Sequence, residues 1–361
     1  MTPPVVVREG VRTGVVVGGG DQAARLRALA GAARVAGSPG VAAVAPVEAA
    51  PQARPTRRSA KIVAVSSGKG GVGKSNVAVN LSIALASPPY GLRVTLLDAD
   101  LGTANADVLC GVMPRARLEE VAAGVRSMRE IAVEAPGGFR LVPGSAGIAR
   151  MADLPAVHRE RLVAAVSELE ADADVVIVDT AAGVGAGVTS FLRLADLGVV
   201  VTTPEPPAIA DAYALVKCVA GRRGQGAEHA RASTLALVVN QVADAAEAAA
   251  VHARIAGVCA RFLGLALPML GHVAHDLRVV AAVRQRRPLL VVDPRAPASR
   301  DVRAVAGAVA QRLGVGAARA AAGGVGRGPS GEPAGSRLRG LFARLLGGHE
   351  TVPAPDLLKT V

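Results

Sequence analysis

Short apolar runs recur through the middle of the chain, and most of them lack the alternation of apolar and polar positions that marks a half-exposed strand. The runs occupy residues 61–67, 92–98, 139–144, 174–179, 197–203, 234–240 and, more weakly, 268–273. Strands that are apolar at consecutive positions are buried on both faces, as in a parallel sheet covered by helices.

Between these runs lie segments whose alanines and leucines repeat at helical spacing. They occupy residues 74–87, 156–170, 208–220 and 246–262. Strands that alternate with helices in this way predict an α/β fold, with three layers and a doubly wound, mostly parallel sheet. We assign residues 61–315 to one domain of this kind, with no internal repeat.

The two ends of the chain differ from this domain in composition. Residues 1–60 combine a candidate short helix at 21–34 with an Ala/Pro/Val-rich stretch that is typical of a flexible linker. Residues 316–335 form a second linker, rich in Gly, Pro and Ser. One more helix-periodic segment follows at 336–347, and a tail occupies 348–361.

Composition narrows the class of protein. Half of the 361 residues are hydrophobic (51%), which suffices for a large core, but no run of 18 uncharged apolar residues predicts a membrane span, so we expect a cytosolic protein. The three cysteines form no CxxC pair, which argues against an iron–sulfur or zinc site. The net charge of +12 lies mostly at the ends, with +5 in residues 1–60 and +3 in residues 315–361.

The sequence GKGGVGKS at 68–75 follows a predicted strand and opens a predicted helix, the context of a phosphate-binding loop. Its glycines let backbone N–H groups point at phosphate oxygens, its last lysine supplies a positive charge, and its serine offers a hydroxyl to Mg²⁺. This predicts ATP and Mg²⁺ as cofactors. The expected nucleotide contacts on the loop are Gly70, Gly71, Val72, Gly73, Lys74, Ser75 and Asn76.

Hydrolysis also needs carboxylates at the carboxyl ends of neighbouring strands. Asp179 ends the apolar run DVVIVD, where a carboxylate would hold the Mg²⁺ shell together with Ser75. Asp98 and Asp100 lie at the end of another strand. We expect Asp98 to support the water ligands of the metal and Asp100 to orient the attacking water. Taken singly, each acid could also be an ordinary strand-end residue.

A second lysine, Lys69, lies five residues before Lys74. From the neighbouring residues alone, Lys69 is as well explained as a solvated charge on the loop as it is by a functional role. However, KGGVGK together with LDAD and IVDTAAG resembles the deviant Walker A ATPases of the MinD, ParA and Mrp group. The resemblance implies an ATP-dependent homodimer in which Lys69 reaches the phosphates of the nucleotide bound by the other subunit, so that Lys69, Lys74 and Asp100 are the catalytic residues.

Longer blocks resemble the FlhG (FleN, YlxH) regulators of flagellar number and placement. They are GKSNVAVNLSIALA, LLDADLGTANADVLCGV, LVPGSAGIARMADL, TTPEPPAIADAYALVK and the region from VHARIAGVCARFLG to LGHVAHDLRVVAAVRQRRPLL. The resemblance implies that Asn240 reads the adenine edge, and that flagellar basal-body components are partners. Ala274 stands where the group usually has proline, which weakens the prediction of the second wall of the adenine pocket.

The heptapeptide DQAARLR at 21–27 resembles the DQAxxLR motif with which FlhG proteins stimulate the GTPase FlhF. The resemblance implies an FlhF-like GTPase as partner and Gln22 as the residue offered to its active site. The alternative is an amphipathic turn without a partner. The implied partner contacts are Asp21, Gln22, Arg25 and Leu26.

The segment SRLRGLFARLLGG at 336–348 carries a single apolar stripe flanked by arginines. It predicts an interfacial membrane helix, and the resemblance implies that this helix binds the inner face of the cell membrane when ATP is bound. The alternative is that the stripe docks on the ATPase domain. The predicted membrane contacts are Leu338, Leu341, Phe342, Leu345 and Leu346.

Other functions of the same fold remain as alternatives. A ParA-type partition ATPase would bind DNA nonspecifically, but the basic residues lie mostly outside the domain. A MinD-type division-site regulator and a nucleotide-bound adaptor with little turnover also fit the loop. An Mrp-like iron–sulfur carrier would need a CxxC pair, and a tyrosine kinase of this class a tail rich in tyrosine, whereas the chain has two tyrosines.

Overall fold

The structure is a computed structural model, and it describes residues 60–100, 104–144, 155–221, 234–315, 338–340 and 342–343. The chain divides into two units, Met1–Pro55 and Thr56–Val361, and every described residue belongs to the second unit. The DQAARLR motif lies outside the described residues, as do Leu341, Leu345 and Leu346.

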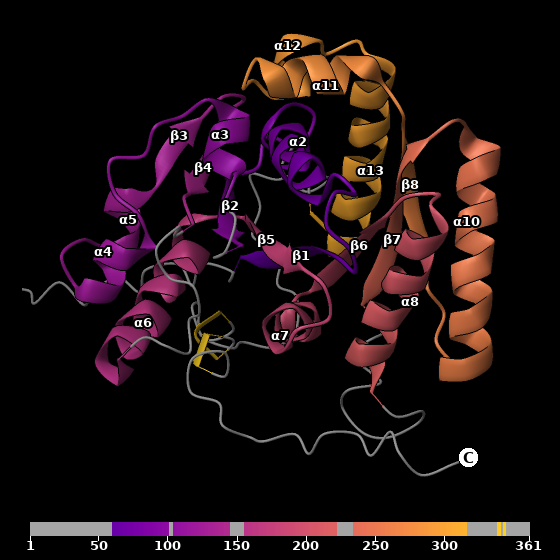
Figure 1. Ribbon diagram of the computed structural model, residues 1–361. Coiled ribbons are helices and arrows are strands. Elements are labelled where there is room, and N and C mark those ends of the chain that lie inside the picture. Colours follow the sequence, from indigo (N-terminus) through magenta and orange to yellow (C-terminus); the bar gives the residue numbers. More distant parts are fainter. Residues whose placement is uncertain are drawn as a thin grey trace, which may run out of the picture. The chain divides into compact units, whose positions relative to one another are not determined.

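A single eight-stranded sheet forms the centre of this unit, in the order β3-β4-β2-β5-β1-β6-β7-β8 (Figure 1). All neighbouring strands are parallel except β3 and β4, which are antiparallel. The strands are β1 (Lys61–Ser67), β2 (Val94–Ala99), β3 (Val133–Ala135), β4 (Phe139–Val142), β5 (Val175–Ala182), β6 (Leu197–Thr202), β7 (Leu235–Val242) and β8 (Met269–Ala274). The predicted doubly wound, mostly parallel sheet is confirmed.

Helices cover both faces of the sheet and complete the three layers (Figure 1). One core joins the sheet to α4–α8 and α10, and the other joins it to α2, α3 and α11–α13. The helices are α2 (Lys74–Ala86), α3 (Ala106–Cys110), α4 (Leu118–Ala123), α5 (Met128–Ile131), α6 (Ala156–Asp172), α7 (Ala186–Leu194), α8 (Pro206–Ala220), α10 (Ala245–Val258) with the π-helical turn η2 (Cys259–Leu263), α11 (Leu277–Arg284), α12 (Leu289–Val292) and α13 (Pro297–Leu313).

The strand order determines where the polar residues meet. Strand β1 lies between β5 and β6, with β2 beyond β5 and β7 beyond β6. Because these strands are parallel, their carboxyl ends lie at the same edge of the sheet. The loop after β1, Asp98 near the end of β2, Asp179 in the carboxyl half of β5, and the polar end of β7 therefore lie toward this edge.

Candidate nucleotide-binding site

The loop between β1 and α2 has a shape that requires glycine at two positions. Gly73 is the N-cap of α2 with φ 83°, and a Cβ there would lie 2.4 Å from Nδ2 of Asn240. A Cβ on Gly68 would lie 2.1 Å from the carbonyl oxygen of Asp211 in α8. Side chains at these positions would push the loop away from β7 and α8, so its backbone is held in one shape by close neighbours.

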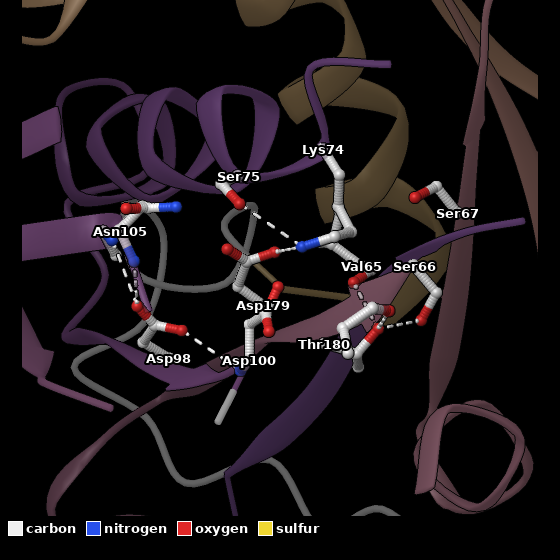
Figure 2. Close-up of polar contacts among 12 residues, drawn as sticks. Val65, Ser66, Ser67, Lys74, Ser75, Asp98, Asp100, Asn105, Asp179 and Thr180 are labelled. Carbon is white, nitrogen blue, oxygen red and sulfur yellow. Dashed lines mark hydrogen bonds and ion pairs between the residues drawn. The ribbon is translucent and has the colours of Figure 1, made fainter. Parts of the chain in front are cut away.

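Lys74, the last residue of the loop motif, begins α2 and is buried against the carboxylate of β5. Its Nζ lies 2.6 Å from Oδ1 of Asp179 and 3.3 Å from Oγ of Ser75 (Figure 2). Burial raises the pKa of Asp179 above its ordinary value, and the ammonium group of Lys74 opposes that rise. Lysine, serine and aspartate thus lie together, as the sequence predicts.

Asp98, the next-to-last residue of β2, lies opposite Asp179, its partner in the pairing of β2 with β5. Its Oδ2 accepts hydrogen bonds of 3.1 Å from the backbone N–H groups of Asn105 and Ala106, and its Oδ1 accepts one of 3.2 Å from Asp100 (Figure 2). Burial, with repulsion from Asp179, raises the pKa of Asp98 to about 7. A cation bound beside Asp98 would favour the ionised form of its carboxyl group and so lower this pKa.

These groups fit Mg²⁺. The cation takes few protein ligands in nucleotide sites and completes its shell with water and phosphate oxygens. Ser75 offers a hydroxyl, and Asp98 and Asp179 offer carboxylates from adjacent strands. No group of three or more His, Cys, Asp or Glu side chains that could hold a metal occurs among the described residues.

The two remaining catalytic candidates lie at the rim of the site. Asp100 is partly exposed at the end of β2, and the three residues after it are not described. Nζ of Lys69 lies 2.8 Å from Oε2 of Glu205, at the start of α8, with 39% and 61% of the two side chains exposed. Lys69 is therefore held within its own chain by a solvent-exposed ion pair.

Asn240 lies at the site, and its side chain holds the phosphate loop. Its Nδ2 donates a hydrogen bond of 2.8 Å to the carbonyl oxygen of Val72. Ala274, at the end of β8, donates its backbone N–H to Oδ2 of Asp301 at 2.9 Å, a bond that proline could not make. The departure from proline at this position thus has a structural counterpart.

Three residues at the site have no counterpart in the sequence predictions. The hydroxyl of Thr180 lies 2.7 Å from that of Ser66 and joins the ends of β5 and β1 (Figure 2). Glu205 pairs with Lys69 across 136 residues of sequence. Glu205 follows the apolar run at 197–203, and nothing in the sequence around it indicates a pairing with Lys69.

Part of the carboxy-terminal segment packs on one face of the sheet, and α2 packs on the other face. Leu338 and Phe342 are fully buried, in the core that includes α6 and α7. The ring of Phe342 meets Phe191 of α7 edge-on at a centroid distance of 5.7 Å, and the N–H of Leu338 donates to the carboxylate of Glu170 in α6. The structure thus records the docked arrangement of these two side chains.

Comparison with known proteins places this geometry in a family. Residues 58–310 match the family model ParA, described as "NUBPL iron-transfer P-loop NTPase". The chain belongs to the ParA/MinD family of P-loop ATPases. As a member of this family it is an ATPase, in agreement with the phosphate loop, Lys74 and the two strand-end aspartates.

Individual family members show how far the similarity reaches. The antiactivator FleN of Pseudomonas aeruginosa is 40% identical over 246 residues, which cover 68% of this chain and 85% of FleN. The flagellum site-determining protein YlxH of Helicobacter pylori is 33% identical over 258 residues, which cover 71% of this chain and 84% of YlxH. These relatives agree with the predicted FlhG group within the ParA/MinD family.

Among solved structures, MinD of Pyrococcus horikoshii complexed with Mg-ADP has the same fold, with a TM-score of 0.55 and 20% identity over 72% of this chain and 99% of that chain. This likeness supports the fold. In this protein, every helix within the part of the chain that the structure describes is too short or too polar to cross a lipid bilayer.

Proposed function

We propose that this protein is an FlhG-type switch ATPase that controls the number or placement of flagella. The observation that carries the proposal is the 40% identity to the antiactivator FleN over 85% of that protein, supported by the similarity to the site-determining protein YlxH. The site supplies what a nucleotide switch requires, since it has a rigid phosphate loop, a buried lysine and carboxylates for Mg²⁺.

ATP binding creates a homodimer through Lys69. In a single chain this lysine pairs with Glu205 at a solvent-exposed site. Exposed ion pairs contribute about 0–1 kcal/mol, so exchanging Glu205 for the phosphates of a facing subunit costs little. A lysine that reaches across the interface adds positive charge to the transferring phosphoryl group, as an arginine finger does.

Hydrolysis uses the strand-end carboxylates. Ser75, Asp98 and Asp179 would hold Mg²⁺ and its water ligands, and the cation would supply positive charge to the phosphate oxygens. Lys74 leaves Asp179 for the β and γ phosphates when nucleotide enters. Asp100, partly exposed at the end of β2, orients the attacking water.

The carboxy-terminal helix couples ATP binding to membrane binding. In the single chain Leu338 and Phe342 are buried against α6 and α7, so this part of the stripe is not offered to lipid. Dimerisation favours release, since two tails on one dimer bind a bilayer with a gain in avidity of order 10² or more. Flanking arginines favour an anionic leaflet at about 1 kcal/mol each.

The amino-terminal DQAARLR motif stimulates an FlhF-like GTPase, with Gln22 offered to the partner's active site. The similarity of the ATPase domain to FleN and YlxH supports this assignment, since the motif precedes a domain of the FlhG group. A peptide of residues 1–35 should raise the GTP turnover of FlhF, and the same peptide with Gln22→Ala should not. An equal rate with and without the wild-type peptide contradicts the activator role.

Deletion of the gene tests the flagellar role. We expect a change in the number or position of flagella per cell, counted by electron microscopy, and restoration by the wild-type gene but not by Lys74→Ala. Normal flagellation of the deletion strain, together with a defect in plasmid or chromosome segregation, would instead favour the partition reading. The ATPase assignment survives either result.

A further inference from the structure

Arg117, the N-cap residue of α4, joins two parts of the chain that both contact Asp98. Its Nη2 lies 2.5 Å from Oδ2 of Asp107 in α3, and its Nη1 donates a hydrogen bond of 3.0 Å to the carbonyl oxygen of Gly144, just beyond β4. Asp107 is only 5% exposed, and a carboxylate buried to this degree needs a charge partner, which Arg117 supplies. The planar guanidinium fork therefore fixes α3 relative to the end of β4.

The start of α3 holds the carboxylate of Asp98. The N–H groups of Asn105 and Ala106 both donate to its Oδ2, at 3.1 Å each. Such N–H groups have no partner within their own helix, so the strand residue satisfies them. Helix α3 has only five residues, too few to be stable alone, so contacts with its neighbours set its orientation. The ion pair of Asp107 with Arg117 is the charged one of these contacts.

Gly144 packs closely against Asp98 as well. A Cβ on Gly144 would lie 2.8 Å from the backbone carbonyl oxygen of Asp98 and 3.2 Å from the Cγ of its carboxyl group. The pairing of β4 with β2 brings the two residues together, and only glycine fits at this separation without displacing a neighbour. The guanidinium group that holds α3 thus also holds the backbone that limits the room around the Asp98 side chain.

We propose that Arg117 is a positioning residue for Mg²⁺ binding and that it acts through Asp98. Mg²⁺ demands near-ideal octahedral geometry, so a carboxylate that supports its water ligands must be held in one orientation. Hydrogen bonds behind such a carboxylate supply that orientation. A guanidinium group cannot itself bind a cation, so its effect must pass through α3 and Gly144. The inference rests on Mg-nucleotide binding by this ATPase, and not on the proposed dimer, membrane or flagellar roles.

ADP affinity of the full chain, measured by calorimetry with Mg²⁺ and again with EDTA, tests the proposal. The ratio of the two affinities gives the enhancement by Mg²⁺. Arg117→Ala should reduce this enhancement about tenfold. Its ADP affinity in EDTA should equal that of the wild type, because the phosphate loop and Lys74 are unchanged. An arginine that only stabilised the fold would leave the enhancement at its wild-type value.

Arg93→Ala is the matched control. Arg93 precedes β2, at the opposite end of the strand from Asp98, and its Nη2 lies 2.6 Å from Oδ1 of Asp174. Its side chain is 40% exposed, against 34% for Arg117. Arg93→Ala should lower the melting temperature and keep the wild-type enhancement by Mg²⁺. Arg117→Lys keeps a charge beside Asp107 but lacks the planar fork, so it should melt closer to the wild type and still lose part of the enhancement.

A double variant shows whether Arg117 acts through Asp98. Asp98→Asn removes the charge that Arg117 positions, so adding Arg117→Ala to it should cause little further loss of the enhancement. Hydrogen exchange at the amides of residues 105 and 106 should quicken in Arg117→Ala. The proposal is overturned by a wild-type enhancement in Arg117→Ala, by an equal loss of both ADP affinities, or by fully additive losses in the double variant. A wild type whose ADP affinity is the same with Mg²⁺ and with EDTA would overturn the proposed Mg²⁺ site as well.

Discussion

Replacing Glu170 by alanine should release the carboxy-terminal segment without disturbing the nucleotide site. Glu170 is fully buried in α6, and its carboxylate accepts the backbone N–H of Leu338 at the start of the described tail. A hydrogen bond to a charged group contributes about 1.5–3 kcal/mol. Loss of about 1.5 kcal/mol shifts the equilibrium between docked and undocked tail roughly tenfold toward the undocked form.

Flotation with vesicles that contain an anionic lipid measures this shift. The nucleotide-free wild type should float weakly, because Leu338 and Phe342 are buried. Glu170→Ala should float up to about tenfold more strongly, because its tail keeps the whole apolar stripe and is released more often. Hydrogen exchange at residues 338–343 should rise in parallel.

Asp172→Ala provides the matched control. Asp172 lies two residues further along α6 and pairs with exposed Arg129, a contact of about 0–1 kcal/mol that does not involve the tail. It should float as the wild type does. The reasoning is refuted if Glu170→Ala keeps both wild-type flotation and wild-type exchange at residues 338–343, or if Asp172→Ala changes both as much.

Two further predictions follow from buried titratable groups. The folded chain holds the Asp98 proton more tightly than the unfolded chain, with a pKa of about 7 against 3.8, so the stability of the nucleotide-free protein should fall as pH rises from about 4 to 7. Asp98→Asn should reduce this slope in thermal melts, and an unchanged slope contradicts the assignment. Burial raises the pKa of Cys110 to about 12 and that of Cys259 to about 11, whereas Cys218 is exposed. A thiol reagent at pH 8 should therefore label Cys218 alone until the protein is unfolded, and labelling of all three in the native state would be inconsistent with this burial.

The strands and the phosphate loop were predictable because their signals are local. Consecutive apolar residues identify strands buried on both faces, and the glycines of 68–75 stand between such a strand and a helix. The parallel order then brings Asp98 beside Asp179, as the strand-end pattern indicates. The valines of α13 also repeat at helical spacing. This helix was not predicted, although its sequence pattern indicates a helix.

Other features depend on contacts that no local pattern contains. Strand β3 has three residues and forms only an antiparallel edge, too short for an apolar run. The pairing of Lys69 with Glu205 and the contact of Glu170 with Leu338 join residues 136 and 168 positions apart. The φ of 60° at Gln241 follows from a register shift between β7 and β8, which the order of residues does not reveal.

The central claim is that Lys69 joins two ATP-bound subunits. Light scattering gives the molar mass of the wild type, Lys69→Ala and the control Lys61→Ala, whose half-exposed lysine pairs with Asp196 at the other end of β1. ATP affinity measured in parallel ensures that each variant is saturated. The account predicts dimers for the wild type and Lys61→Ala with Mg-ATP, and a nucleotide-loaded monomer for Lys69→Ala. A full dimer population in saturated Lys69→Ala would contradict it.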